Sequence, residues 1–280
     1  MIKRILVALD QDADTPVAVD YAFDAAHRNR AEVTGLAVVD VNRIENTSSG
    51  GGIGSMYYAE KLREKLTVKT RIRAQELVKE FSDASEAEHI PYQVDVKEGI
   101  PSDEIVEDLK YHDILLIGNN PHFFYGHPDQ TTTTLGHVVQ KCVAPVIIVP
   151  DTRKKIKTAV LGYDGSGPAV RAMQRFAQMA PFGRDITVHI VSISSKNDHA
   201  ASEMLTIHAG EFLQRHGFKT ERVCLYGNKP IEHILNYAEQ QAAELIIAGA
   251  HSVSRMKRMA FGSTTASLVE DGRFVLFLER

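Results

Sequence analysis

The stretch Ile5-Leu6-Val7-Ala8-Leu9-Asp10 reappears in the second half of the chain as Ala159-Val160-Leu161-Gly162-Tyr163-Asp164. Three further pairs of segments recur in the same order: Gly99–Ile105 with Gly227–Ile234, Asp113–Gly118 with Glu244–Gly249, and Val146–Val149 with Phe274–Phe277. Four matches in one order indicate an internal duplication, and 280 residues are enough for two domains of ordinary size. We therefore predict two tandem domains, residues 1–152 and 153–280.

Within each copy, short apolar segments alternate with segments of helical periodicity. The predicted strands are 3–10, 32–39, 92–97, 113–118 and 145–150, then 157–163, 186–193, 219–225, 244–249 and 273–278. The predicted helices are 15–29, 59–88, 102–111 and 133–142, then 168–180, 199–216, 230–242 and 263–271. Continuously apolar strands are typical of parallel sheets covered on both faces. The alternation predicts an α/β fold with a doubly wound, Rossmann-like, five-stranded parallel sheet in each copy.

Composition excludes several classes of protein. The net charge of −4 argues against a general affinity for nucleic acid. No apolar run approaches the roughly 18 residues that a membrane helix needs, so no membrane contact is expected. Cys142 and Cys224 are far apart and form no CxxC pair, which argues against a disulfide framework or a thiolate zinc site. Residues 1–10 are too short in their apolar part for a signal peptide, so we expect a cytoplasmic protein.

The charge is unevenly distributed between the copies. Residues 1–150 contain 15 Lys and Arg against 23 Asp and Glu, whereas residues 151–280 contain 17 against 13. The second copy is therefore the better host for an anion, unless the surface charge has simply drifted between the copies. The basic stretch at 153–157 lies between the copies and is interpreted as a solvated linker.

Ligands of open parallel sheets bind beyond the carboxyl ends of the strands, where the strand order reverses. In the second copy, Gly249 ends a strand at a place where bare backbone can approach a ligand. Gly262 and Ser263 open a helix whose free N–H groups and positive dipole end suit a phosphate, and Thr264 adds a second hydroxyl. A glycine turn followed by an ordinary Ser/Thr helix cap is the alternative.

This segment resembles the nucleotide motif of the universal stress protein family, Gly-x-x-Gly followed after nine residues by Gly-Ser/Thr. Gly249 matches the first glycine, and Gly262 with Ser263 matches the last pair. Ser252 replaces the second glycine and places a Cβ where the family has bare backbone. A serine still offers its N–H and hydroxyl, so the replacement weakens the expected site without excluding it.

The resemblance extends over both copies and implies a fold of the adenine nucleotide alpha hydrolase type. In ATP-binding members of the family, the strand-one aspartate and a strand-two valine flank the adenosine, which here implies Asp164 and Val191. The resemblance thus implies an ATP or AMP site, with or without Mg²⁺, in the second copy. Its predicted residues are Asp164, Gly165, Val191, Gly249, His251, Ser252, Gly262, Ser263 and Thr264. No catalytic residue and no metal ligand is assigned.

The first copy departs further from the motif. Asp10, Val38 and Gly118 match, but the second glycine is missing, and the last pair falls on Thr132-Thr133 after a one-residue insertion. The loop at 119–130 is aromatic and has no Lys or Arg, so we expect no triphosphate binding of the family type here. His122, His127 and Asp129 have metal-ligand side chains, but such loop residues are usually unliganded. The Gly/Ser segment 47–54 is a lid, a partner contact or a plain surface loop.

Three functions remain open. The leading hypothesis is a regulatory stress-response protein that binds adenine nucleotide in the second copy. The alternative is a nucleotide-independent interaction module, which Ser252 and the degenerate first copy favour. Slow ATP hydrolysis is the least favoured, because the chain shows no Walker Gly-Lys-Ser/Thr motif. The family commonly pairs domains through their last strands, which implies pairing of 146–149 with 274–278 within this chain, while homodimerisation of the whole chain stays open.

Overall fold

The computed structural model describes residues 1–40, 55–123, 134–194, 199–250 and 263–280. Its strands form one sheet in the order β3-β2-β1-β4-β5-β10-β9-β6-β7-β8, so each half of the chain contributes five neighbouring strands. Strand pairs within each half are parallel, and the two halves have the same strand order. The predicted pair of doubly wound five-stranded parallel sheets is confirmed.

The elements agree closely with the sequence pattern. The first half contains β1 (Arg4–Leu9), α1 (Asp14–Asn29), β2 (Glu32–Val39), α3 (Ser55–Ala87), β3 (Tyr92–Glu98), α4 (Pro101–Leu109), β4 (Ile114–Gly118), α5 (Thr134–Lys141) and β5 (Val146–Val149). The second half contains β6 (Thr158–Gly162), α6 (Gly167–Met179), β7 (Thr187–Ser194), α7 (His199–Arg215), β8 (Lys219–Tyr226), α8 (Pro230–Gln240), β9 (Leu245–Gly249), α9 (Ser263–Asp271) and β10 (Val275–Glu279). The largest difference is at the start of α3, which was expected at residue 59.

Two apolar layers cover the sheet. One contains residues of α1, α3, α6 and α7, and the other contains residues of α4, α5, α8 and α9. In β1, Ile5 and Val7 belong to the first layer, and Leu6 and Ala8 belong to the second. Because successive side chains of a strand point to opposite faces, a continuously apolar segment is buried on both.

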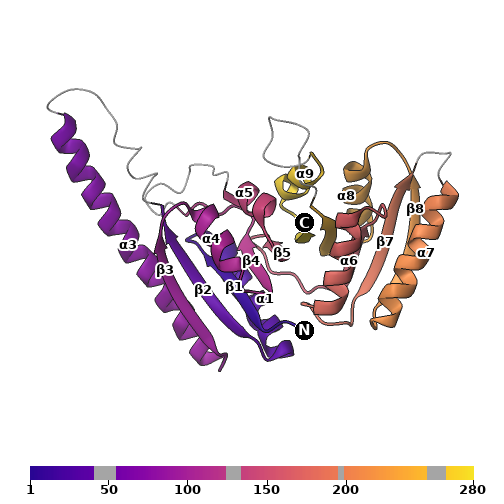
Figure 1. The fold of residues 1–280 in the computed structure, drawn as a ribbon, viewed down its shortest axis with the longest axis horizontal. Helices are drawn as coiled ribbons and strands as arrows, with labels where there is room; N and C mark the ends of the chain where they lie inside the picture. The colour runs from indigo at the N-terminus through magenta and orange to yellow at the C-terminus, as the bar shows by residue number, and fades with distance from the viewer. Residues whose placement is uncertain (41–54, 124–133, 195–198, 251–262) are drawn as a thin grey trace.

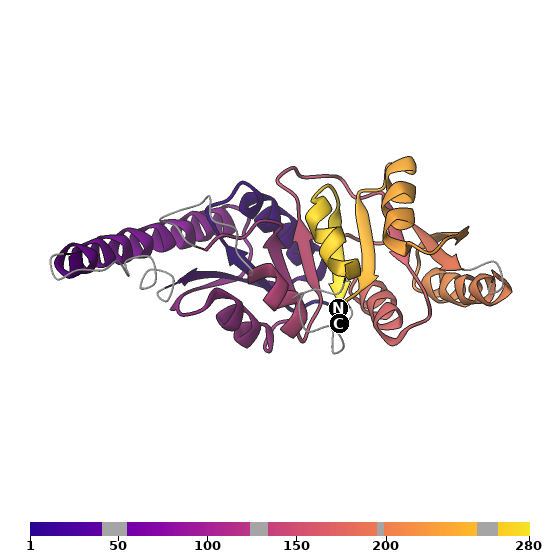
Figure 2. The same ribbon diagram turned by 90° about the horizontal axis from the view of Figure 1, so that it is seen from above.

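The two halves join through their last strands. β5 and β10 pair antiparallel, with Ile147 opposite Phe277 and Ile148 opposite Leu276, and these four side chains are buried. The pairing removes two strand edges that would otherwise be open to other chains. Figures 1 and 2 show the β5–β10 region at the middle of the molecule, with one half on each side. The expected pairing within the chain is confirmed.

The outermost strands correct one expectation. β3 and β8 are not covered on both faces, and most of their side chains are exposed or half-buried. They lie at the two ends of the sheet order, and α3 and α7 pack against them on one face only. Their polar residues, such as Asp95 and Glu221, fit that one-sided environment.

Helix α3 is the longest element and extends well beyond the sheet (Figures 1 and 2). Its far part exposes Leu62, Val68 and Ile72. Among the described helices, none combines the length and the apolar content that a membrane span requires.

Candidate functional site

The strand order reverses between β6 and β9 in the second half, because β6 pairs with β7 on one side and with β9 on the other. Residues that follow these two strands therefore lie on the two sides of one crevice, which is where open parallel sheets bind ligands. β1 and β4 have the same relation in the first half. These two carboxyl edges are the candidate sites, and they are built differently.

The turn after β6 presents an exposed carboxylate. The Oδ1 atom of Asp164 accepts a hydrogen bond from the N–H of Ser166 at 2.9 Å, while the side chain remains exposed. Gly165 has a φ of +74°, a left-handed conformation that favours glycine. Ser166 is the N-cap of α6, and its hydroxyl accepts from the N–H of Ala169 at 3.5 Å. Among the described residues, the bond from the N–H of Ser166 is the hydrogen bond found for the Asp164 side chain.

Gly249 at the end of β9 is a packing position. A Cβ built on it would lie 2.4 Å from the carbonyl carbon of Pro168 and 2.6 Å from the nitrogen of Ala169. The missing side chain therefore lets the first turn of α6 approach β9. The first glycine of the predicted motif is explained by helix–strand contact, whatever ligand the crevice takes.

Val191, the predicted strand-two residue, lies inside the sheet. It is fully buried in β7 and pairs with Gly162, and its carbonyl accepts the N–H of Tyr163 at 2.9 Å. Ser194 ends the strand three residues later, and its buried Oγ atom has no hydrogen-bond partner within the described ranges. Ser194 is therefore the described residue that ends β7 on its carboxyl side.

The remaining predicted residues are placed only in part. Ser263 and Thr264 form the first turn of α9, as predicted, but their side chains lie outside what the structure describes. His251, Ser252 and Gly262 fall outside the described residues. The structure thus brings Asp164, Gly165 and Gly249 to one edge of the sheet together with the start of α9.

In the first half, the aspartate that corresponds to Asp164 is covered by the protein itself. Asp10 is 3% exposed, and its Oδ2 atom accepts the N–H of Phe123 at 3.1 Å and that of His122. Its Oδ1 atom accepts the N–H of Gln11 at 2.6 Å. Burial raises the pKa of Asp10 to about 7, and the charge of Asp12 acts in the same direction. The loop after β4 therefore closes over the loop after β1.

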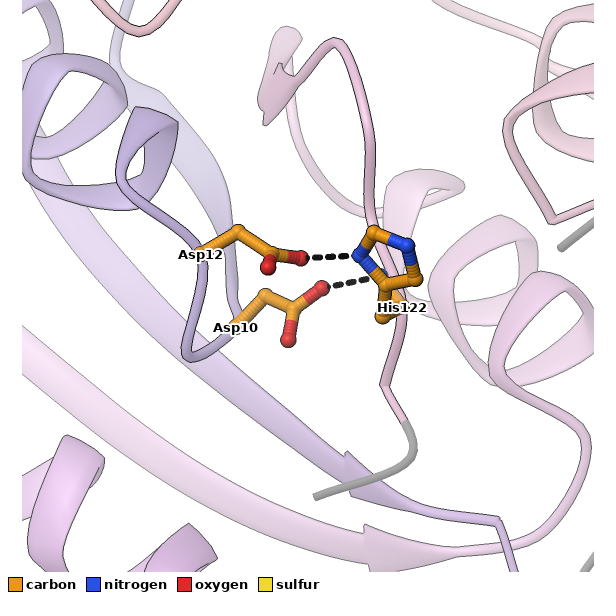
Figure 3. Close-up of side chains that lie close together, drawn as sticks. All are labelled: Asp10, Asp12 and His122. Atoms are coloured by element: carbon orange, nitrogen blue, oxygen red, sulfur yellow. Dashed lines mark hydrogen bonds and ion pairs between the residues drawn. The ribbon is translucent and has the colours of Figure 1, made fainter. Parts of the chain in front are cut away.

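The same two loops are joined by a second contact. The Nδ1 atom of His122 lies 2.5 Å from the Oδ2 atom of Asp12, and both side chains are about four-fifths buried. Figure 3 shows the His122 ring facing Asp12, with the Asp10 carboxylate beside it. His122 thus uses its ring for one aspartate and its main-chain N–H for the other.

Two further residues close this edge. Phe123 has a φ of +43° and is fully buried in the layer that contains α4 and α5. Asp14, in the first turn of α1, accepts the N–H of Asn120 at 3.1 Å. Its carboxylate also packs against Gly118, because a Cβ built on this glycine would lie only 2.1 Å from Oδ1 of Asp14. Burial raises the pKa of Asp14 as well. The described residues Asp14, Asn120, His122 and Phe123 thus join the ends of β1 and β4 through contacts within the chain.

Sequence reasoning overlooked Asp12 and Asp14. The signal was present in the spacing Asp10-Gln11-Asp12-Ala13-Asp14, three carboxylates directly after a buried strand. The spacing did not reveal which residue these carboxylates contact, because His122 lies 110 residues away from Asp12. His127 and Asp129, which were considered beside His122, fall outside the described residues.

Comparisons with known proteins agree on one family. The model of the universal stress protein family matches residues 1–150 and 155–272. The universal stress protein Slr1230 of Synechocystis is 26% identical over 96% of each chain. The crystal structure of a universal stress protein from Archaeoglobus fulgidus covers 99% of this chain and 98% of its own, with 19% identity and a TM-score of 0.70. A universal stress protein solved in complex with cAMP matches 44% of this chain, with 21% identity and a TM-score of 0.38.

Proposed function

Since the chain belongs to the universal stress protein family, we propose that it is a regulatory protein that binds one adenine nucleotide, ATP or AMP, at the carboxyl edge of its second half. The observation that carries the proposal is the contrast between two corresponding aspartates. Asp164 is exposed beyond the end of β6, whereas Asp10 is buried under the loop after β4. The exposed carboxylate of Asp164 supports binding of a polar ligand at the second edge.

The proposed roles follow from the chemistry of each group. The Asp164 carboxylate would accept hydrogen bonds from a ribose hydroxyl, and Ser194 offers a buried hydroxyl at the neighbouring strand end. The first amides of α9 carry N–H groups without partners inside the helix, which suits a phosphate. Gly165 allows the left-handed turn after β6, and Gly249 allows α6 to pack closely against β9. The proposal includes binding with or without Mg²⁺ and no catalytic step.

Nucleotide titration by calorimetry tests this proposal. ATP and AMP are titrated into wild-type protein, Gly262→Asp and Asp164→Asn, with and without Mg²⁺. Gly262→Asp would place a carboxylate at the proposed phosphate site and should abolish binding. Asp164→Asn should weaken it by about tenfold, which corresponds to one lost hydrogen bond to a charged group. Asp185→Asn, an exposed aspartate at the opposite end of β7, is the matched control and should bind as wild type.

The alternative is a nucleotide-independent interaction module. One observation favours it: the contact between Gly249 and Pro168 accounts for the first motif glycine without any ligand. Equal behaviour of wild type and Gly262→Asp, with no heat of binding in either, would support this second function. We further propose that the protein acts in the cytoplasm, which fits its two free cysteines.

A further inference from the structure

We propose that Asp10, Asp12 and His122 form a binding site for a divalent transition-metal ion in the first half of the chain. One ligand atom from each residue lies within 4.8 Å of the others, which is a spacing that one ion can bridge. Figure 3 shows the three side chains converging from two separate loops. This site is distinct from the proposed nucleotide site and does not depend on it.

The ligands are already held in place. The Asp10 carboxylate accepts two main-chain N–H groups on Oδ2 and one on Oδ1, which orients the group and leaves Oδ1 a second lone pair for an ion. His122 is fixed through its own N–H to Asp10. Its ring nitrogen and the Asp12 carboxylate are 2.5 Å apart, so a small shift of either side chain admits an ion between them. Such preorganisation lowers the cost of binding.

The local charge also favours a cation. Asp14 is 4% exposed and its Oδ1 atom has no partner in the described part of the chain, so a further buried carboxylate lies within electrostatic reach of Asp12. Within the described ranges, no Lys or Arg forms an ion pair with Asp10, Asp12 or Asp14. Carboxylates that are removed from water need a positive partner, and a bound ion can be the largest local charge of such a site.

A route to the cluster exists. A cavity of about 460 Å³ between α1 and α3 is lined by Asp10 and Asp12. Its other charged lining groups are Asp20, Glu80, Glu88 and Arg73, and the guanidinium of Arg73 is bonded to Glu76 and Glu80. The acidic lining draws cations toward the cluster.

The donor set selects the class of ion. One imidazole nitrogen and two carboxylates suit Zn²⁺ or Mn²⁺, whereas Mg²⁺ prefers an all-oxygen site that retains water. Metal binding requires a lone pair on Nδ1 of His122, so any proton there is released to solvent or moves to Nε2. Three protein ligands leave at least one position of the ion for water or an external anion.

The second half provides an internal comparison. The residue that corresponds to Asp12 is Ser166, which caps α6, and Asp164 is exposed rather than covered. Among the described residues, no second group of three metal-ligating side chains is found. Within the described residues, the proposed metal site is therefore confined to the first copy.

Calorimetric titration of the chelator-treated, nucleotide-free chain with ZnCl₂, MnCl₂ and MgCl₂ tests the proposal. The expected result is one tight site for Zn²⁺ or Mn²⁺ and at least tenfold weaker binding of Mg²⁺. His122→Ala and Asp12→Asn should each lower the affinity by at least tenfold. The matched control is His27→Ala, because His27 lies 3.3 Å from Glu88 in an exposed pair, and the described residues provide no third ligand beside it. It should bind as wild type.

Two further measurements establish that the variants are folded and identify the ligands of the ion. Circular dichroism of each metal-free variant establishes that it is folded, and X-ray absorption of the Zn²⁺ form should report one imidazole and several oxygen neighbours. Absence of a tight site in wild type overturns the proposal, and so does unchanged affinity in a folded His122→Ala or Asp12→Asn protein. Since no nucleotide is present, these outcomes are independent of whether the second half binds one.

Discussion

Gly249 packs directly beneath Pro168, so that a Cβ on the glycine would lie 2.4 Å from the carbonyl carbon of the proline. The first half repeats the relationship with Gly118 and Asp14. In each copy, the glycine ends the fourth strand, and its partner lies in the first turn of the helix that follows the first strand. The duplicated glycine therefore serves the packing of this helix against the sheet.

This contact predicts that Gly249→Ala lowers the free energy of unfolding by about 1 to 3 kcal/mol, because the obstructing atoms are backbone and cannot rotate away. Gly210→Ala in α7 is the matched control. Its Cβ would have ordinary contacts at 3.5 Å, and alanine favours a helix interior, so the change should be neutral or stabilising by up to about 1 kcal/mol. Urea denaturation of wild type and both variants measures these changes in the free energy of unfolding. Equal effects of the two substitutions would contradict the packing role.

His112 predicts a dependence of stability on pH. Its Nδ1 donates to the carbonyl of Asp108 at 2.8 Å, and its Nε2 accepts from the hydroxyl of Thr34 at 2.9 Å. Burial lowers the pKa of His112 below its ordinary value. The unfolded chain therefore binds a proton at His112 more readily than the folded chain does. The stability that neutral His112 contributes is complete above the unfolded pKa of about 6.5, and it is lost as the pH falls through the folded pKa.

The check for His112 is a difference measurement. Unfolding free energies of wild type and His112→Gln are compared from pH 8 down to pH 5. The variant is expected to be less stable at pH 8, because it loses two hydrogen bonds, and the gap should narrow as the pH falls. A gap that stays constant over this range would show that His112 does not titrate differently in the folded and unfolded states.

The two thiols should differ in reactivity. Burial raises the pKa of Cys142 to about 12, and this side chain is 3% exposed, whereas Cys224 is half-buried on β8. At pH 8, iodoacetamide should modify Cys224 in the native protein and reach Cys142 only after unfolding, because the thiolate is the reactive form. Peptide mass spectrometry locates the label. Modification of both thiols at similar rates in folded protein would be inconsistent with the described burial.

Most of the fold could be predicted from the sequence because its signals are local. The apolar runs ending at Asp10 and Asp164 define the first strand of each copy, and helical periodicity defines the elements between. One-sided burial of β3 and β8 could not be predicted in the same way. It depends on their position at the two ends of the sheet, which is set by pairings between distant segments.

The candidate sites were less predictable because they depend on contacts across the chain. Asp164 and Gly165 were identified from their position after a strand, and the structure places them at the crevice. Val191 was chosen by resemblance and is fully buried, while Ser194 ends the strand. The Asp12–His122 contact joins two loops 110 residues apart, and periodicity carries no information about such a pair.

The most direct test of the account is a crystal structure of the full chain grown with excess ATP and Mg²⁺. We expect one nucleotide per chain, with its adenosine beside Asp164, its phosphates at the start of α9, and none beside Asp10. A nucleotide beyond β1 and β4, or an empty crevice beyond β6 and β9, would contradict it.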